Sequence, residues 1–373
     1  MRVLVADDAV LFRRLLAEML ASLPGVEVVG TATNGRIAVQ KTRELRPDLL
    51  TLDIEMPEMD GLAVLDELAR NGQQEMEIIV VSALSRRGGD LTMRALEKGA
   101  FDFITKPEAA SPEQARQKLL EELAPRIRAV SNRVEVRAIL RGNPPQARPL
   151  PAVVLTQPAS AARAAGGDGI VSRMGRISNH QKPEMVLIGV STGGPVALAQ
   201  LLPAIPRDIG VPILIVQHMP PIFTKSLAEN LDSKCAVHVC EAVHGEFPEP
   251  NTAYIAPGGR QMRLGSGPEN RPVIELTDDP PENNCRPAVD YLFRSAAIRF
   301  PGRAMAVILT GMGSDGTVGL RLLKRQGCYV IAQDETSCVV YGMPKAAVDA
   351  GVTDVILPLN SIAGRIGAVV AGG

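Results

Sequence analysis

Short apolar runs alternate with amphipathic segments in two parts of this chain, and this alternation limits the possible folds more than any other feature. In the first part the apolar runs lie at residues 2–6, 26–31, 48–52, 77–81 and 101–104. In the second they lie at residues 185–188, 211–217, 253–256, 305–310 and 329–333. Such runs predict parallel strands covered by helices on both faces of a sheet. We therefore expect an α/β protein with two doubly wound, mostly parallel sheets.

Length and composition agree with two globular domains and give no reason to expect a nucleic-acid partner or insertion into a membrane. The chain has 373 residues, of which 46% are hydrophobic and 22% charged, and its formal net charge is −1. That charge gives no reason to expect a nucleic-acid partner. With 3% aromatic residues and no tryptophan, stacking on single-stranded nucleic acid is not expected. No apolar run is long enough to cross a membrane.

The N-terminus, the cysteines and the middle of the chain complete the expected organisation. The first residues turn acidic after five positions, unlike a signal peptide, and the five scattered cysteines suggest reduced thiols in a cytoplasmic protein. Residues 141–182 are rich in proline, alanine and glycine, which is typical of a flexible linker. We expect one domain over residues 1–125, a helix end and linker over 126–182, and a second domain over 183–373.

In the first domain, polar side chains follow the predicted strands. Asp7, Asp8, Asp53, Ser82 and Lys106 all stand at carboxyl ends, where ligand sites of such sheets lie. Three carboxylates at one edge repel each other, so the site predicts a hard divalent cation such as Mg²⁺. The lysine charge and the serine hydroxyl suit a phosphoryl group carried by an aspartate.

The second domain opens with a glycine-rich turn, Met185–Pro195, with the sequence MVLIGVSTGGP. Its apolar run predicts a buried strand, and Pro195 suits the first turn of the following helix. Ser191 then lies on a sharp turn between strand and helix. The turn fits the G-x-S-x-G pattern of a nucleophilic serine, and it equally fits a glycine turn that cradles a phosphate.

Residues at two further strand ends favour a nucleophilic serine over a phosphate-binding turn. His218 follows the apolar run 211–217, and Asp315 follows the run 305–310. A serine hydroxyl needs a base, and an imidazole oriented by a carboxylate provides one. The chain order Ser191, His218, Asp315 differs from that of α/β-hydrolases, which predicts another fold with the same chemistry.

A metal site is a weaker alternative in the second domain. Cys235, His238, Cys240 and His244 lie close together in the sequence, but their spacing is not a familiar zinc pattern. Along a strand, the two cysteines would face opposite sides. Core thiols with surface histidines are the favoured interpretation.

Residues 1 to about 125 resemble a response-regulator receiver domain. The matching segments are VLVADDAVLFRRLL, LDIEMPEMDG, VVSA and DFITKP. The resemblance implies five parallel strands in the order 2-1-3-4-5 and Asp53 as the phosphoacceptor. It also implies Mg²⁺ held by Asp7, Asp8, Asp53 and the backbone carbonyl of Glu55. Ser82 and Lys106 would sense the phosphoryl group, and Phe103 would be the switch aromatic.

Residues 184 to about 370 resemble the catalytic domain of the CheB family of chemotaxis methylesterases. The matching segments are IGVSTGGP, VQHMPPIFTKSLAENLD, YIAPGGRQMRL, CRPAVDYLFRSAA, ILTGMGSDGTVGL and YGMPKAA. The resemblance implies a Rossmann-like domain that uses no cofactor. Ser191 would be the nucleophile, His218 the general base and Asp315 its orienting carboxylate. Thr192 and the backbone N–H of Met312 would lie near the oxyanion.

Together the two resemblances imply a serine hydrolase that phosphorylation activates. Its expected substrate is a glutamate methyl ester on the cytoplasmic bundle of a chemoreceptor, with deamidation of receptor glutamine as a second activity. A CheA-type histidine kinase would supply the phosphoryl group, and the unmodified receiver would cover the Ser191 site. The alternative is a phospho-regulated module that binds the receptor with little or no catalysis. A DNA-binding output domain would need a basic recognition helix, and residues 183–373 show none.

Overall fold

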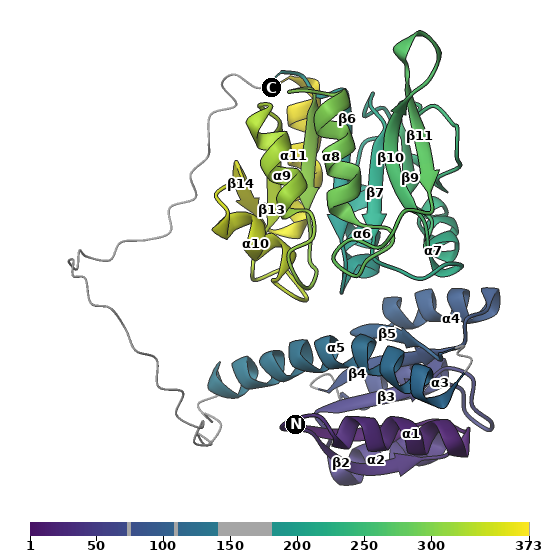
Figure 1. Ribbon diagram of the computed structural model, residues 1–373. Helices are drawn as coiled ribbons and strands as arrows, with labels where there is room; N and C mark the ends of the chain where they lie inside the picture. The colour runs from purple at the N-terminus through teal and green to yellow at the C-terminus, as the bar shows by residue number, and fades with distance from the viewer. Residues whose placement is uncertain (73–75, 108–110, 141–180, 373) are drawn as a thin grey trace, which may run out of the picture.

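The computed structural model describes residues 1–72, 76–107, 111–140 and 181–372. The predicted linker falls almost wholly on residues 141–180, outside the described residues. The described parts form two α/β units, each built on its own sheet (Figure 1).

The first unit has a five-stranded parallel sheet in the order β2-β1-β3-β4-β5, which confirms the expected receiver topology. Its strands are β1 (Arg2–Ala6), β2 (Glu27–Ala32), β3 (Leu49–Asp53), β4 (Glu77–Ser82) and β5 (Asp102–Thr105). Its helices are α1 (Val10–Ala21), α2 (Gly35–Leu45), α3 (Gly61–Arg70), α4 (Arg86–Glu97) and α5 (Pro112–Leu140).

Alternating strand residues place these helices on the two faces of the sheet. Val3 and Val5 of β1 pack with residues of α1 and α5, whereas Leu4 and Ala6 pack with residues of α2, α3 and α4. Successive side chains of a strand point to opposite faces, so a strand that is apolar at every position needs helices on both. The carboxyl edge of the sheet stays open for polar groups.

The second unit has a seven-stranded parallel sheet in the order β14-β13-β12-β6-β7-β9-β8. Its strands are β6 (Met185–Val190), β7 (Ile213–Gln217), β8 (His238–Glu241), β9 (Thr252–Ile255), β12 (Ala304–Ile308), β13 (Tyr329–Gln333) and β14 (Val355–Leu357). Its helices are α6 (Gly194–Leu201), α7 (Phe223–Asp232), α8 (Val289–Arg299), α9 (Thr317–Arg325), α10 (Met343–Asp349) and α11 (Leu359–Ala371).

A separate antiparallel pair, β10 (Gln261–Ser266) and β11 (Pro272–Thr277), was not expected from the sequence. Only some residues of each strand are buried, so neither strand has the continuous apolar run that would have predicted it. The buried ones pack beside α8 in the core cluster that also holds α9 and α10. The helices α6, α7 and α11 cover the other face of the sheet.

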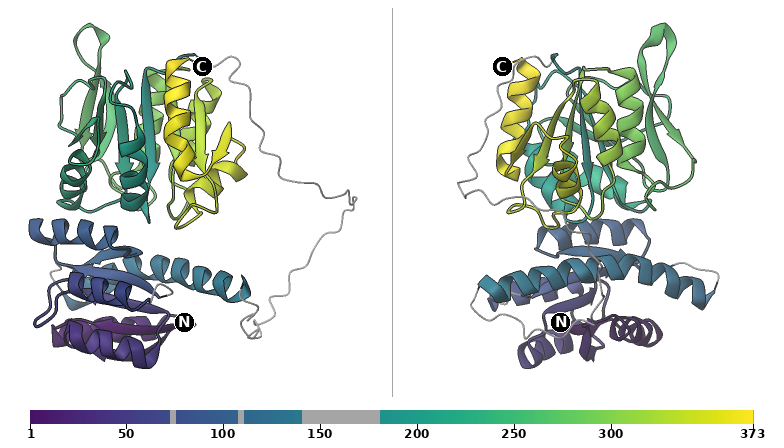
Figure 2. Two further views of the ribbon diagram at one scale, coloured as in Figure 1. Left: turned by 180° about the vertical axis from the view of Figure 1, so that it is seen from behind. Right: turned by 60° about the vertical axis from the view of Figure 1, so that its left-hand side comes forward.

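The two units meet where α4 of the first packs against α7 of the second (Figures 1 and 2). Helix α4 approaches closely because Gly89 has no side chain: a Cβ there would lie 2.7 Å from Oγ of Ser226. The rings of Phe103 and Phe223 stack with centroids 4.9 Å apart. Glu97 accepts a hydrogen bond from Asn230 at 2.7 Å. The contact therefore combines close packing, an aromatic pair and polar pairs at its rim.

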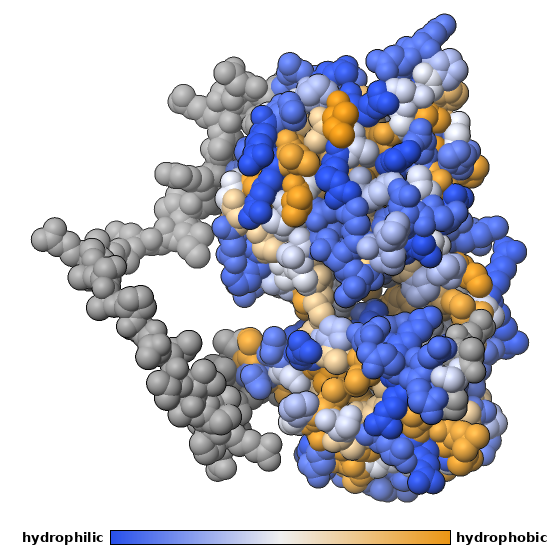
Figure 3. All heavy atoms as spheres, viewed as in Figure 1, coloured by the Kyte–Doolittle hydropathy of each residue, from blue (hydrophilic) through white to orange (hydrophobic). Residues whose placement is uncertain are grey.

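The helices of the described residues can be compared with the length and hydropathy that a membrane span requires. No helix there has the length and apolar character needed to cross a bilayer. In the view of Figure 3, hydrophilic residues cover most of the face and apolar residues are scattered among them.

Helix α8 allows a test of the packing of the second unit. Phe293 is fully buried in the core, whereas Ile298 on the same helix is 78% exposed. We expect Phe293→Ala to lower the free energy of unfolding by about 3–5 kcal/mol, because it removes buried contacts and leaves a cavity. Ile298→Ala should change it by less than about 1 kcal/mol. Chemical denaturation of both variants checks this, and equal midpoints would contradict the assigned core.

Candidate active site and phosphorylation site

The Ser191 turn joins β6 to α6 as the sequence predicted. Gly193 has a φ of 76°, a backbone angle that favours glycine. A Cβ on Gly194 would lie 1.9 Å from Oε1 of Gln217, so this position also needs glycine. Nε2 of Gln217 donates to the backbone carbonyl of Ser191 at 3.0 Å. Gln217 therefore holds the turn in place, and Ser191 at its tip is partly exposed.

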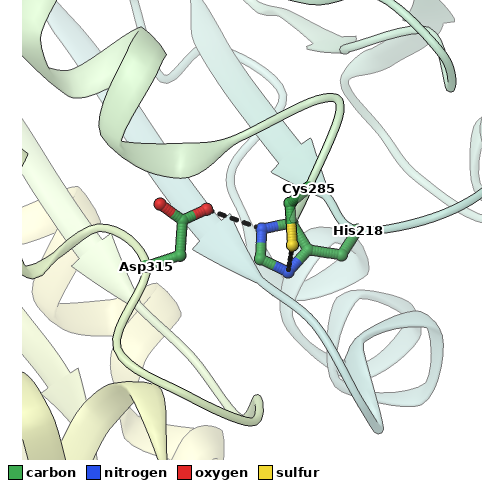
Figure 4. Close-up of side chains that lie close together, drawn as sticks. All are labelled: His218, Cys285 and Asp315. Carbon is green, nitrogen blue, oxygen red and sulfur yellow. Dashed lines mark hydrogen bonds and ion pairs between the residues drawn. The ribbon is translucent and has the colours of Figure 1, made fainter. Parts of the chain in front are cut away.

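His218 and Asp315 meet as predicted at the carboxyl edge of the second sheet (Figure 4). Nε2 of His218 lies 2.7 Å from Oδ2 of Asp315, and the two side chains are 12% and 3% exposed. Oδ2 also accepts from the backbone N–H of Val289 at 2.7 Å. Oδ1 accepts from the backbone N–H of Asp290 at 3.0 Å and from Nδ2 of Asn283 at 2.9 Å. The carboxylate is thus held in one orientation.

The electrostatics of this pair favour the charged forms. Burial lowers the pKa of His218, but its hydrogen bonds with Asp315 and Cys285 outweigh burial and raise the pKa to about 9. Burial raises the pKa of Asp315, but the hydrogen bond with His218 and its charge bring that pKa below the usual range. The pair therefore favours the imidazolium, and His218 can accept a proton at Nδ1 only in those molecules whose ring is neutral.

The backbone of Ser191 lies near this pair, since the N–H of His218 donates to the carbonyl of Val190 at 3.1 Å. Among the described residues, no hydrogen bond joins the Ser191 hydroxyl to His218; Nδ1 of the imidazole instead lies 3.4 Å from Sγ of Cys285. Ser191 does lie beside the loop that carries Asp315, because a Cβ on Gly311 would be 2.8 Å from Cβ of Ser191. The backbone of Met312 follows directly, and Thr192 beside Ser191 is buried.

Sequence reasoning missed two contributors to this site. Cys285 lies on the loop between β11 and α8, and its CRP run carried no chemical pattern of its own. Asn283, two residues earlier, donates to Oδ1 of Asp315 at 2.9 Å and to Oδ2 of Asp290 at 3.2 Å. Burial raises the pKa of Asp290 to about 6. The amide of Asn283 thus connects two buried carboxylates, a link between distant chain segments that no local spacing could reveal.

The alternative metal residues have other partners. Nδ1 of His238 lies 2.9 Å from Oδ1 of Asp232, and Nδ1 of His244 accepts from the backbone N–H of Leu276 at 3.1 Å. Cys235 packs against the core cluster on one face of the sheet and Cys240 against the cluster on the other. The two thiols therefore do not converge on one point.

The first unit brings its predicted acidic residues together. Nζ of Lys106 lies 2.6 Å from Oδ2 of Asp53 and 3.0 Å from Oδ2 of Asp7. Burial raises the pKa of Asp53 to about 6, although the bond with Lys106 acts in the opposite direction. Burial lowers the pKa of Lys106, but the two carboxylates outweigh burial and raise that pKa. Lys106 is therefore a fixed cation beside the predicted phosphoacceptor.

The three aspartates also suit a cation. Asp7, Asp8 and Asp53 each offer an oxygen within 4.8 Å of the others. An all-oxygen donor set of this kind fits Mg²⁺. The backbone N–H of Glu55 donates to Oδ1 of Asp53 at 3.3 Å, which keeps the β3 loop close to the cluster.

The remaining two predicted residues are Ser82, which contacts α4, and Phe103, which contacts the second unit. Oγ of Ser82, at the end of β4, donates to the backbone carbonyl of Gly88 in α4 at 3.1 Å. Phe103 is buried and stacks on Phe223 of the second unit. The sequence did not indicate this contact, because it joins residues of two separate domains.

Comparisons with known proteins match each of the two units to a family. Residues 186–366 match the family model of the CheB methylesterase, and residues 3–143 match that of the response regulator receiver domain. A protein-glutamate methylesterase/protein-glutamine glutaminase of Desulfotalea psychrophila is 46% identical, over 98% of this chain and 97% of its own. The chain belongs to this family.

Other members of the family are similar over the whole chain or over its second unit. The protein-glutamate methylesterase/protein-glutamine glutaminase of Halalkalibacterium halodurans is 41% identical over 98% of this chain and 97% of its own. The CheB methylesterase catalytic domain of Thermotoga maritima is 43% identical, covers 50% of this chain and 98% of its own, and has a TM-score of 0.49. CheB enzymes are hydrolases, so the family supports catalysis over the alternative of a binding module.

The source of the high His218 pKa can be tested directly. We expect Asp315→Asn to lower the pKa of His218 from about 9 towards its ordinary value, because a neutral amide no longer favours the imidazolium. The chain has only four histidines, so NMR titration of their ring C–H signals can separate them. Asp232→Asn, at the exposed pair with His238, is the matched control. An unchanged His218 titration in Asp315→Asn would contradict this explanation.

Proposed function

We propose that this CheB-family chain hydrolyses glutamate methyl esters on the cytoplasmic bundle of a chemoreceptor, and that phosphorylation of its receiver increases the rate. The observation that carries the proposal is the His218–Asp315 pair, 2.7 Å apart, beside the Ser191 turn on one sheet edge. Deamidation of receptor glutamine would use the same groups, because it differs only in the leaving group.

In the proposed mechanism, Ser191 Oγ attacks the ester carbonyl carbon while Nδ1 of His218 accepts its proton. For this, the imidazole must exchange its contact with Cys285 for one with Ser191. Asp315 keeps the proton on Nε2 and stabilises the imidazolium. The backbone N–H of Met312 and the side chain of Thr192 would stabilise the oxyanion. Methanol leaves with the proton from His218, and water then hydrolyses the acyl-serine to glutamate.

Substitution of Ser191 tests the proposed nucleophile. We expect Ser191→Ala to reduce methanol release from methyl-labelled receptor membranes by about three orders of magnitude or more, because no acyl-enzyme can form. Ser314→Ala, at an exposed serine on the loop of Asp315, should stay within about twofold of the wild type. Wild-type chain that captures the receptor but releases no methanol would instead support the binding-only alternative.

The proposed regulation follows from the position of the receiver. The carboxyl ends of β6 and β7, which lead to Ser191 and His218, point towards the receiver (Figure 1). Just after His218, the backbone turns at Ile222, with a φ of 74°, into α7, which packs against α4. The receiver thus lies where a receptor helix would have to approach Ser191.

Phosphorylation of Asp53 would act on the contact between α4 and α7 through Ser82 and Phe103. Asp7, Asp8, Asp53 and the carbonyl of Glu55 would hold Mg²⁺, which when bound neutralises charge on the entering phosphoryl group. Lys106 would pair with the phosphoryl oxygens. Ser82 now donates to Gly88 of α4, so a turn of its hydroxyl towards the phosphoryl group would free that end of the helix. Because α4 and Phe103 both contact α7, either change weakens the interface.

Loosening the interface should imitate phosphorylation. A side chain at Gly89 would collide with Ser226, so we expect Gly89→Gln to raise methanol release without a phosphodonor by roughly tenfold, equal to about 1.4 kcal/mol of coupling. Asp90→Gln, on the exposed side of the same helix, should leave the basal rate unchanged. Asp53→Ala should remove the response to a small-molecule phosphodonor. A basal rate in Gly89→Gln equal to the wild type would argue against blocking by the receiver.

A further inference from the structure

The base histidine has a second polar neighbour that the proposed mechanism does not use. Sγ of Cys285 lies 3.4 Å from Nδ1 of His218. In Figure 4 the thiol is drawn in front of the ring, with its contact to one ring nitrogen, and the Asp315 carboxylate lies to the side of the other nitrogen. Cys285 is partly exposed, so solutes can reach the pair from its loop.

The spacing of this pair suits a soft divalent cation. Zn²⁺ binds histidine nitrogen at about 2.0–2.1 Å and cysteine sulfur at about 2.3 Å, and two such bonds at a tetrahedral angle place the nitrogen and the sulfur about 3.5 Å apart. The observed separation is 3.4 Å. The distance between the two atoms therefore needs almost no change, and a rotation of the Cys285 side chain would bring the sulfur to an ion that lies in the ring plane.

Asp315 adds the outer contact that such a site needs. A metal-bound histidine usually donates its other ring N–H to a carboxylate, which fixes the tautomer and orients the ring. Here Nε2 lies 2.7 Å from the buried Oδ2 of Asp315. In the neutral ring this leaves the lone pair on Nδ1, in the plane of the ring. One donor atom from each of the three residues lies within 4.8 Å of the others.

We propose that Cys285 and His218 form a binding site for Zn²⁺ or a similar thiophilic divalent cation, and that the bound ion inhibits the hydrolase. The thiol releases its proton to solvent, as does Nδ1 where the ring is an imidazolium, and the sulfur and Nδ1 each replace one water molecule on the ion. The lone pair that must accept the Ser191 proton is then engaged in a metal bond. With two protein ligands instead of the four of structural zinc sites, binding is reversible. The inhibition, though not the binding, rests on the proposed function.

Binding is tested without any assay of activity. The full-length chain is titrated with Co²⁺, whose bond to a thiolate absorbs in the near ultraviolet, in excess Mg²⁺ that occupies the receiver carboxylates. We expect the absorption in the wild type and in Cys240→Ser, a partly buried thiol on β8, and its loss in Cys285→Ser and Cys285→Ala. The same absorption in all four proteins, or in none, would overturn the proposal.

Inhibition is then measured as methanol release with and without Zn²⁺, each protein being compared with its own zinc-free rate. A Zn²⁺ concentration that slows the wild type and Cys240→Ser about tenfold should slow Cys285→Ser less than about twofold, and a chelator should restore the rate. Equal inhibition of all three would overturn the proposal. A chain that hydrolyses without the cobalt absorption contradicts this inference alone, whereas absorption without hydrolysis contradicts the proposed function alone.

Discussion

The buried carboxylate of Asp315 is the group on which the catalytic edge depends. Four elements of the chain meet at its two oxygens: the end of β7 through His218, the start of α8 through two backbone N–H groups, the loop before α8 through Asn283, and its own loop after β12. A buried charge is costly unless it is fully hydrogen-bonded. The requirement to satisfy this one group therefore fixes the relative positions of segments that lie far apart in the sequence.

The two sites differ in how completely their buried carboxylates are neutralised by hydrogen bonds and neighbouring charges. In the receiver, Asp53 and Asp7 share Lys106, and burial leaves the pKa of Asp53 raised. That cluster is incompletely neutralised, which suits a site that accepts a cation and a phosphoryl group. In the catalytic domain, Asp315 is fully satisfied and its pKa is lowered. The two carboxylates therefore differ in charge balance: the pKa of Asp53 is raised and that of Asp315 is lowered.

The interface between the domains connects these sites through a few side chains. Phe103 stacks on Phe223, and Ser82 donates to α4, which packs against α7. Helix α7 begins five residues after His218. Asp53 lies opposite Val81 in the sheet, next to Ser82, so few residues separate the acidic cluster from the loop that carries His218.

The sequence by itself determined the two parallel sheets, because apolar runs of strand length with amphipathic segments between them can be buried only in that way. It also determined which residues would gather, since the carboxyl ends of parallel strands share one edge: Ser191, His218 and Asp315 on one sheet, and Asp7, Asp53 and Lys106 on the other. Local spacing could not give the β10–β11 pair, whose burial is only partial.

Only the tertiary structure decided which atoms meet within those edges. It placed Cys285, and not Ser191, beside Nδ1 of His218, and it brought Asn283 between two carboxylates. It also stacked Phe103 on a ring of the other domain. Each of these contacts joins segments that are distant along the chain and depends on loop paths and rotamers. Periodicity determines which side of an element is buried, and the packing of the whole molecule determines what each side chain then touches.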